Sequence, residues 1–378
     1  MRIGLVAGEA SGDLLGAGLI KAIRAIVPTA TFEGVAGPAM SAAGCDTWES
    51  CEALAVMGLV EPLKEIPRLL RLRRSLIRRW RENPPDVFVG IDAPDFNMGL
   101  EKALRKSSIP TVHYVSPSIW AWRPGRIKTV KKAADTVLCI LPFEKSLYDE
   151  HGIDAVFVGH PKADAAPATV STHAVRQVLG LDSSKVVAVL PGSRRGEVER
   201  LGPIFAGAAA LLASTDDDLY FVTPVATPKL RPLIEQQLDA AGVRDRFTLL
   251  DGQSQAAMSS ADLVLLASGT AVLEAALLGK PTVAAYKVAA LTYFIAKTLR
   301  LVKLQHYTLP NLLTKEPYVP EFIQGAATPA AIAECVSEML NDREWRALIT
   351  DRFAKLRAEL ALGADERAAD AVIRVARR

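Results

Sequence analysis

The stretch Asp262-Leu-Val-Leu-Leu-Ala-Ser-Gly-Thr-Ala-Val-Leu-Glu-Ala-Ala-Leu-Leu-Gly-Lys-Pro-Thr-Val-Ala284 contains the whole repeating unit of an α/β fold. Its apolar run at residues 263–267 predicts a buried strand of a parallel sheet. A helix is expected from residue 271 to 278, because Gly279 and Pro281 are typical of the point where a helix stops. A second strand is expected at residues 282–286.

The turn between the first strand and the helix is a natural phosphate site. At Ser268, Gly269 and Thr270, backbone N–H groups and the positive end of a helix dipole point away from the sheet. Glu274 lies one helical turn past Thr270 and shares its face. A solvated glutamate is the alternative, but Glu274 has no capping-box partner, since Ala271 lacks a side-chain oxygen. We therefore predict that Glu274 faces a ligand.

The same pattern of strand, turn and helix recurs along the whole chain. Its 378 residues exceed the size at which single cores usually stop growing. The pattern stops at a Pro-containing linker, residues 163–172, and then restarts. We therefore predict two doubly wound parallel-sheet α/β domains, residues 1–164 and 165–378. The sequence leaves open whether the last helices pack back on the first domain.

The composition excludes several classes of protein. A formal net charge of +3 is too small to indicate nucleic-acid binding. The four cysteines form no C-x-x-C pair and the five histidines include no H-E-x-x-H motif, so we expect no metal and no cofactor. No apolar run reaches the roughly 18 residues of a membrane span, and the first residues do not fit a secretory signal. We expect a cytoplasmic protein, either soluble or attached peripherally to a membrane.

Asp92 is the candidate general base of the first domain. It ends the predicted strand at residues 86–92, and ligands of open α/β sheets bind outside the carboxyl ends of the strands. Helix capping or a structural hydrogen bond is the alternative role for Asp92. Asp95 is better explained as a helix cap, although the sequence alone does not settle which of the two carboxylates is the base.

The first turn, Gly8-Glu-Ala-Ser-Gly-Asp13, leads from a strand into a helix. Its glycines lack the G-x-G-x-x-G spacing of dinucleotide-binding proteins, which disfavours a dehydrogenase. The turn is either an ordinary connection between strand and helix or the floor of a polar pocket. In the second case, Ser11 and Asp13 are available for sugar hydroxyls.

A loop rich in tryptophan and arginine occupies residues 116–126, after the strand that is expected next along the chain from Asp92. Core packing is one interpretation of Trp120 and Trp122. Phosphate contacts by Arg123 or Arg126 are the alternative, because a guanidinium group suits phosphate geometry.

Two segments of the second half are further candidates for a binding site. Pro191-Gly-Ser-Arg-Arg-Gly-Glu-Val198 opens a helix and predicts an anion cradle of backbone N–H groups with Arg194 and Arg195, unless these arginines are merely solvated. Residues 303–313 mix polar and apolar side chains without a period. This mixture suggests a wall of the site, with Asn311 exposed in it.

Residues 64–81 are the most basic run of the chain, with eight Lys or Arg residues. Apolar residues at 69, 72, 76 and 80 recur at helical spacing, so the run predicts a basic amphipathic helix. It is either a solvated helix on a domain surface or an interfacial helix that faces an anionic bilayer. With the apolar loop before it, residues 54–81 are the predicted membrane contact.

Six long and unusual motifs occur in order across both halves of the chain. They are Leu5-Val-Ala-Gly-Glu-Ala-Ser-Gly-Asp13, Val89-Gly-Ile-Asp-Ala-Pro-Asp-Phe-Asn97, His113-Tyr-Val-Ser-Pro-Ser-Ile-Trp-Ala-Trp122, Leu190-Pro-Gly-Ser-Arg194, Ala267-Ser-Gly-Thr270 and Leu309-Pro-Asn-Leu-Leu313. Together they closely resemble the motifs of the bacterial lipid-A-disaccharide synthase family. The resemblance extends from the first strand to about residue 325.

The resemblance implies a GT-B glycosyltransferase, with two Rossmann-like domains facing a central cleft and no metal. Such enzymes transfer 2,3-diacylglucosamine from its UDP donor to the 6-hydroxyl of 2,3-diacylglucosamine 1-phosphate (lipid X). The products are the β(1→6)-linked lipid A disaccharide 1-phosphate and UDP. The family acts at the cytoplasmic face of the inner membrane of Gram-negative bacteria, as a peripheral protein. A homodimer is compatible with the sequence.

The resemblance also implies roles for the candidate residues. Asp92 would be the base that takes a proton from the acceptor. Arg194 and the turn at residues 268–270 would hold the diphosphate of UDP, Glu274 would accept from the ribose hydroxyls, and Asn311 would complete the donor site. Positioning of the acceptor is assigned to Ser11, Asp13 and Arg123.

Other functions are also compatible with two such domains. One is another UDP-sugar enzyme, such as a peptidoglycan N-acetylglucosaminyltransferase or a UDP-sugar epimerase. A soluble epimerase, however, would not need residues 54–81 to be so apolar and basic. A non-catalytic sugar-nucleotide-binding module is the other alternative, and it would have no need for Asp92.

Overall fold

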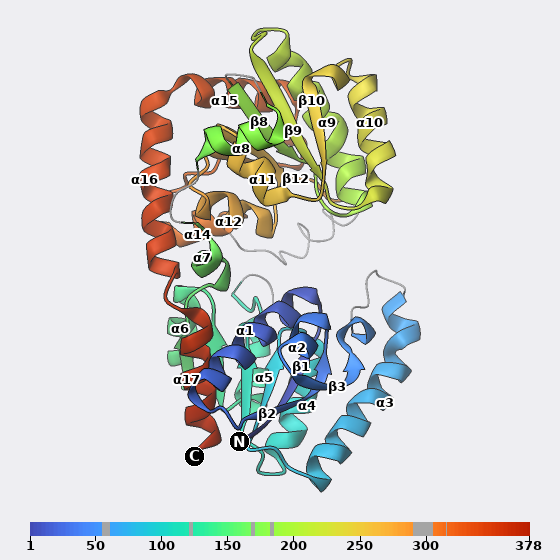
Figure 1. Ribbon diagram of the computed structural model, residues 1–378, viewed down its shortest axis with the longest axis vertical. Coiled ribbons are helices and arrows are strands. Elements are labelled where there is room, and N and C mark those ends of the chain that lie inside the picture. Colours follow the sequence, from blue (N-terminus) through green and yellow to red (C-terminus); the bar gives the residue numbers. More distant parts are fainter. Residues whose placement is uncertain (55–60, 121–123, 168–170, 182–184, 290–304, 315) are drawn as a thin grey trace. The chain divides into compact units, whose positions relative to one another are not determined.

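The computed structural model describes residues 1–54, 61–120, 124–167, 171–181, 185–289, 305–314 and 316–378, with only the backbone described at residues 61–65 and 124. The chain divides into two compact units (Figure 1). Unit 1 comprises residues 1–164 and 360–378, and unit 2 comprises residues 165–359.

Unit 1 is built on a seven-stranded parallel sheet. In spatial order its strands are β3 (Cys45–Ser50), β2 (Thr31–Ala36), β1 (Arg2–Ala7), β4 (Val87–Ile91), β5 (Thr111–Tyr114), β6 (Thr136–Cys139) and β7 (Ala155–Phe157). The order reverses between β1 and β4, whose last residues Ala7 and Ile91 are paired. The carboxyl ends of β1 and β4 are therefore the topological switch point, where open α/β sheets bind ligands.

The connections of unit 1 are mostly helical, as right-handed crossovers between parallel strands require. The helices are α1 (Ala10–Ile26), α2 (Pro38–Ala42), α3 (Glu61–Glu82), α4 (Pro94–Arg105), α5 (Ile127–Ala133), α6 (Pro142–Asp149) and α7 (Pro161–Ala165), with short 3₁₀ turns η1 (Cys51–Ala53) and η2 (Pro124–Arg126). Apolar side chains of α1, β1, β2 and β4 form the main buried cluster.

The last helix of the chain, α17 (Ala364–Ala376), belongs to unit 1. Its alanine and valine side chains share a buried cluster with those of α1, and the two helices lie side by side in Figure 1. The Asp164 carboxylate accepts hydrogen bonds from the backbone N–H groups of Gly363 and Ala364, at 3.0 and 2.7 Å. The sequence left the path of the last helices open, and this helix returns to the first unit.

Unit 2 contains a six-stranded parallel sheet. In spatial order its strands are β10 (Phe247–Asp251), β9 (Leu219–Val225), β8 (Lys185–Leu190), β11 (Leu263–Ala267), β12 (Thr282–Tyr286) and β13 (Glu321–Ile323). The order reverses between β8 and β11, which are paired through Leu190 and Leu266. The carboxyl ends of β8 and β11 are therefore the switch point of this sheet.

Helices cover the sheet of unit 2 and bury a large apolar cluster against it. They are α8 (Thr172–Leu179), α9 (Arg195–Ala213), α10 (Arg231–Ala240), α11 (Ser254–Ser260), α12 (Thr270–Leu277), α14 (Leu309–Leu313), α15 (Pro329–Asn341) and α16 (Arg343–Leu360), with 3₁₀ turns η3 (Pro228–Leu230), η4 (Arg244–Arg246) and η5 (Gln324–Ala326). Within the described ranges, no helix is both long and apolar enough to cross a membrane.

Candidate active site

Asp92 lies just past the end of β4, at the switch point of the first sheet. Its backbone N–H donates to Tyr114 O at 2.8 Å, which extends the pairing of β4 with β5. Asp92 and Ala93 then adopt left-handed backbone conformations, with φ of 53° and 42°. Such conformations cost about 1–3 kcal/mol each and persist only where the surrounding structure fixes them. The chain therefore leaves the sheet abruptly at Asp92, whose side chain is half-buried.

Two contacts fix this strained turn. The buried Asn97 of α4 donates from Nδ2 to Asp92 O at 2.8 Å. Gly8, the first residue after β1, packs so closely that a Cβ there would lie 2.2 Å from Ala93 Cβ. The turns after β1 and β4 are therefore in contact. Ser11, exposed in the first turn of α1, lies at the same edge of the sheet as Asp92.

Asp13 is buried, with 4% of its surface exposed. Its carboxylate oxygens accept hydrogen bonds from the backbone N–H groups of Gly37, Ala39 and Met40, at 2.9, 2.8 and 2.9 Å. These charge-assisted bonds fix the start of α2. The expectation that Asp13 is available for sugar hydroxyls is therefore wrong, because all three bonds use the carboxylate inside the unit.

A buried pair of titratable side chains lies next to the strand end that carries Asp92. His113 Nδ1 lies 2.6 Å from Glu101 Oε1, and neither side chain is exposed. Burial disfavours the charged imidazole, but the charge and hydrogen bond of Glu101 outweigh burial and raise the pKa of His113, with a smaller contribution from Asp92. Gly90 leaves room for the pair, since a Cβ there would lie 2.1 Å from Glu101 Oε1.

Sequence reasoning did not single out Asn97, Glu101 or His113 as candidate residues. Three atoms of this cluster, Asn97 Oδ1, Glu101 Oε2 and His113 Nε2, are buried and have no hydrogen-bond partner among the residues that the structure describes. Buried polar atoms are nearly always satisfied, so such a concentration beside a strained turn is typical of functional sites. The one available sequence signal was Gly90, because glycine inside a buried strand indicates a close approach of another group.

Asp95 lies in the first turn of α4, and 83% of its side chain is exposed. The N-cap of this helix is Ala93, so the prediction that Asp95 caps the helix is wrong. Its carboxylate instead forms an ion pair with Arg126. Arg123 and Trp122 lie outside the described residues, and the predicted phosphate contact of Arg123 stays a prediction.

Trp120 packs within unit 1. Its Nε1 donates to Glu144 Oε1 at 3.2 Å, and its ring meets the Phe143 ring edge-on at 5.1 Å between centroids. Burial raises the pKa of Glu144 to about 7. Trp120 is therefore partly buried against Glu144 and Phe143 and does not belong to the core.

In unit 2 the predicted phosphate turn lies at the switch point. The strands at residues 263–267 and 282–286 have the predicted bounds, and α12 starts at Thr270. Gly269 and Thr270 are exposed, and a Cβ at Gly269 would meet no atom of the described residues within 4 Å. The backbone at the helix start is therefore open to a ligand. Ser268 and Glu274 are partly buried.

Arg194 follows the neighbouring strand β8, so its loop and the turn at residue 268 belong to the same switch point. Its side chain is 71% exposed, and its Nη1 lies 3.4 Å from Glu197 Oε1. Glu197 Oε2 also accepts from the backbone N–H groups of Ser193 and Arg194, at 3.1 and 3.3 Å. We expected these two backbone N–H groups to be free to bind an anion. This expectation is wrong, because both already donate to Glu197. The Arg194 side chain remains open to a ligand.

Asn311 is 3% exposed, so the expectation of an exposed side chain is wrong. Its Nδ2 donates to Val319 O at 2.7 Å and to Glu321 Oε1 at 2.9 Å, while its Oδ1 accepts from Val319 N at 2.9 Å. Glu321 in turn accepts from Tyr307 N at 3.0 Å, and Ser268 Oγ donates to Tyr307 O at 3.5 Å. Asn311 therefore reaches the donor turn through a chain of contacts.

Helix α3 uses its apolar stripe for packing. Leu76 and Trp80 are buried against the sheet of unit 1, and Leu69 and Leu72 pack against the same cluster. Arginines cover much of its outer side, with exposed side chains at residues 68, 71, 74, 78, 79 and 81. The part described is thus a basic helix on a domain surface, whereas residues 55–60 and the side chains of residues 61–65 lie outside the description.

No group of three His, Cys, Asp or Glu side chains within the described ranges could hold a metal ion.

Comparison with known proteins decides the family. The family model described as Lipid-A-disaccharide synthetase matches residues 3–374. The chain belongs to the lipid-A-disaccharide synthase family. A lipid-A-disaccharide synthase of Alkalilimnicola ehrlichii is 49% identical over 100% of this chain and 99% of its own length. One from Hahella chejuensis is 48% identical over 98% of this chain and 93% of its own length. The resemblance inferred from the six motifs is thus confirmed.

Solved structures place this lipid-A-disaccharide synthase family member in the GT-B fold. A UDP-GlcNAc 2-epimerase from Neisseria meningitidis, bound to UDP-GlcNAc, aligns with a TM-score of 0.62 at 15% identity and covers 99% of both chains. A glycosyltransferase involved in lipopolysaccharide biosynthesis aligns with a TM-score of 0.57 at 14% identity, over 98% of this chain and 99% of its own. The predicted fold class, with two Rossmann-like domains, is confirmed.

Proposed function

We propose that this chain is the inverting glycosyltransferase that condenses UDP-2,3-diacylglucosamine with 2,3-diacylglucosamine 1-phosphate, giving the β(1→6) lipid A disaccharide 1-phosphate and UDP. The match of nearly the whole chain to the lipid-A-disaccharide synthase family carries this proposal. The placement of a candidate base at one switch point and of two phosphate-directed loops at the other supports it.

In the proposed reaction, Asp92 takes the proton from the 6-hydroxyl of the acceptor. The acceptor oxygen then forms its bond to the anomeric carbon of the donor, while the bond from that carbon to the UDP oxygen breaks and its electron pair leaves with UDP. A positioned general base contributes about 10²–10⁴-fold. The rigid turn at Asp92, held by Asn97 and Gly8, supports this role because it fixes the base before substrate arrives.

The donor half of the reaction belongs to unit 2 in this proposal. Negative charge develops on the diphosphate as the donor bond breaks, and stabilisation of such charge is usually the largest catalytic contribution. The Arg194 guanidinium and the N–H groups at the start of α12 suit this task, and Glu274 is placed one turn later for the ribose. Asn311 is a positioning residue, which acts on Ser268 through Glu321 and Tyr307.

We further propose peripheral attachment to the cytoplasmic face of the inner membrane through α3. Its exposed arginines favour an anionic surface, by about 1 kcal/mol for each residue near that surface. The apolar stripe is already packed, so this attachment is mainly electrostatic over the described part of the helix. Retention on vesicles that contain phosphatidylglycerol at low salt, and release at high salt, is the expected result. Absence of retention at low salt would remove the membrane contact.

The decisive test is incubation of the purified protein with both proposed substrates. UDP and a disaccharide 1-phosphate should appear together, in equal amounts. Formation of UDP without disaccharide would indicate hydrolysis, and absence of both products would refute the proposed transfer.

A further inference from the structure

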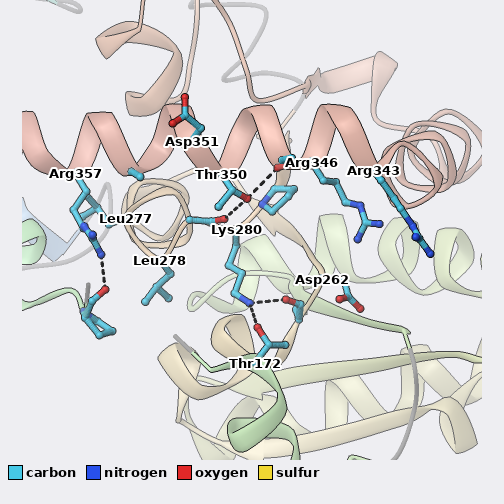
Figure 2. A pocket seen from close by; sticks show the side chains of 16 residues that line it. Thr172, Asp262, Leu277, Leu278, Lys280, Arg343, Arg346, Thr350, Asp351 and Arg357 are labelled. Atoms are coloured by element: carbon cyan, nitrogen blue, oxygen red, sulfur yellow. Dashed lines mark hydrogen bonds between the residues drawn. The ribbon is translucent and has the colours of Figure 1, made fainter. Parts of the chain in front are cut away.

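Unit 2 has a strongly cationic region at the edge of its sheet opposite the donor turn. A cavity of 810 Å³ lies beside the start of α16 and the turn that leads into β12 (Figure 2). Asp262 and Lys280, which line it, come just before β11 and β12, whereas Ser268 comes just after β11. The cavity is therefore at the amino edge of the second sheet, and the donor turn is at the opposite, carboxyl edge.

The positive charges of this cavity outnumber its carboxylates. Lys280, Arg343, Arg346 and Arg357 line it, together with two acids, Asp262 and Asp351. Figure 2 shows that Asp351 points away from the other labelled side chains, and its carboxylate pairs with Lys355 at 2.7 Å.

Asp262 is also engaged elsewhere. Its Oδ2 lies 2.7 Å from Arg176 Nη2 and accepts from Val186 N at 2.9 Å. Over the described part of the chain, neither Arg343 nor Arg346 forms an ion pair. Arg346 Nε is moreover buried without a hydrogen-bond partner. Two guanidinium groups thus border the cavity without a neutralising partner.

The buried ammonium group of Lys280 adds to this positive field. Only 7% of the residue is exposed, and Nζ donates to two neutral oxygens, Thr172 Oγ1 and Ala261 O, both at 2.8 Å. Burial lowers the pKa of Lys280 to about 8, although the charge of Asp262 opposes this shift. The lysine therefore retains charge at neutral pH but has no carboxylate bonded to it.

The position of the two arginines is costly without a bound anion. Arg343 and Arg346 are three residues apart on one helix, where like charges destabilise each other. They also lie at the amino-terminal start of α16, where the helix dipole disfavours cations. Asp342 and Glu344, at the same helix start, offset part of this cost, although Asp342 Oδ1 is used as a cap for Trp345 N at 2.8 Å. An anion between the guanidinium groups would relieve both repulsions.

We propose that this cavity binds a phosphate-bearing anion, with Arg343 and Arg346 as its ligands and Lys280 as a supporting charge. Guanidinium groups match the geometry of phosphate oxygens, and apolar side chains such as Leu278 and Ala347 line the same cavity. A free phosphate compound and the headgroup of an anionic lipid offer this chemistry equally. The site is independent of the proposed transfer reaction, since it lies at the other edge of the sheet.

Calorimetric titration of the full chain with inorganic pyrophosphate, with saturating UDP present to occupy the donor turn, tests the site. The R343A/R346A variant should bind at least about tenfold more weakly than wild type, as expected for the loss of charge-assisted bonds. Arg352→Ala is the matched control, because Arg352 lies on the same helix but over the Tyr318 ring, outside the cavity. This control should bind as wild type does.

Flotation with phosphatidylcholine vesicles, with and without phosphatidylglycerol, separates the two sources of phosphate. A headgroup site predicts weaker retention of R343A/R346A than of Arg352→Ala on the anionic vesicles, whereas a site for free phosphate predicts equal retention and a change in pyrophosphate affinity alone. If the double variant does not fold, Arg346→Gln replaces it in both arms. Equal pyrophosphate affinity together with equal retention for all variants would overturn the proposal.

Discussion

His113 Nδ1 lies 2.6 Å from Glu101 Oε1, and neither side chain is exposed to solvent. The pair lies next to the strand end that carries Asp92. Removal of one partner from such a buried pair is strongly destabilising, because the other partner keeps its desolvation cost. The pair therefore makes the region around Asp92 sensitive to single substitutions and to pH.

His113→Gln should remove a pH-dependent part of the stability. The pKa of His113 is raised in the folded protein, so its contribution is fully present below the ordinary value of 6.5 and is lost as pH rises through the folded pKa. Urea unfolding should show wild type more stable than the variant by about 1–3 kcal/mol at low pH, with the difference shrinking at high pH. His151→Gln, at an exposed histidine, is the control. Parallel pH curves for wild type and His113→Gln would contradict the assignment.

Asp92→Asn should lower turnover by about 10²–10⁴-fold. Asparagine tolerates the left-handed backbone better than most residues, so this variant tests the carboxylate and not the turn. Its affinity for UDP should equal that of wild type in a calorimetric titration. Asp95→Asn is the matched control, because that carboxylate is exposed and paired with Arg126. Near-normal turnover of Asp92→Asn, or a larger loss in Asp95→Asn, would transfer the role of base to another residue.

Arg194→Ala should weaken UDP binding by about tenfold or more, since a charge-assisted hydrogen bond contributes about 1.5–3 kcal/mol. Arg195→Ala provides the comparison, because Arg195 is equally exposed and lies 2.8 Å from Glu199, one helical turn further along. The measurement is the dissociation constant of UDP for both variants. Unchanged affinity of Arg194→Ala would exclude this residue from the donor site.

Asp13→Asn should unfold more easily while it keeps its affinity for UDP. The substitution replaces a carboxylate that accepts three backbone hydrogen bonds, and we expect a loss on the order of 3 kcal/mol in the free energy of unfolding. Ser11→Ala, at an exposed position of the same turn, should be neutral for stability. An Asp13→Asn variant of wild-type stability would restore the idea that this carboxylate serves a ligand.

Much of the fold could be predicted from the sequence because parallel strands are buried on both faces and appear as short apolar runs. The strands at residues 263–267 and 282–286 have the predicted bounds. Strand β3 was missed, since most of its side chains are exposed and Asp46 and Glu49 break the apolar pattern. Strand β13 was missed for a different reason: only three residues pair with β12, too few for a pattern.

The candidate site residues could be predicted where their role follows from their position in a single strand, turn and helix. Asp92 and Ser268 could be placed because each follows an apolar strand. The environments of Asp13 and Asn311 could not, because the backbone N–H groups that bind Asp13, and the Val319 backbone and Glu321 carboxylate that bind Asn311, are brought near only by the folded structure. Glu197 is different, because its partners are local: its carboxylate accepts from the N–H groups of Ser193 and Arg194, four and three residues before it, as in a capping box. Sequence patterns thus located the loops but not the hydrogen bonds inside them.

The return of α17 to unit 1 has a consequence for synthesis on the ribosome. Unit 2 is one continuous segment, residues 165–359, so all of it is synthesised before α17. Unit 1 is discontinuous, and the apolar face of α1 that α17 covers stays uncovered until residues 364–376 have left the exit tunnel. Domains usually fold in the order of synthesis. Here the unit whose synthesis starts first is completed after unit 2, and a nascent chain that stalls before residue 364 leaves the apolar face of α1 exposed to chaperones.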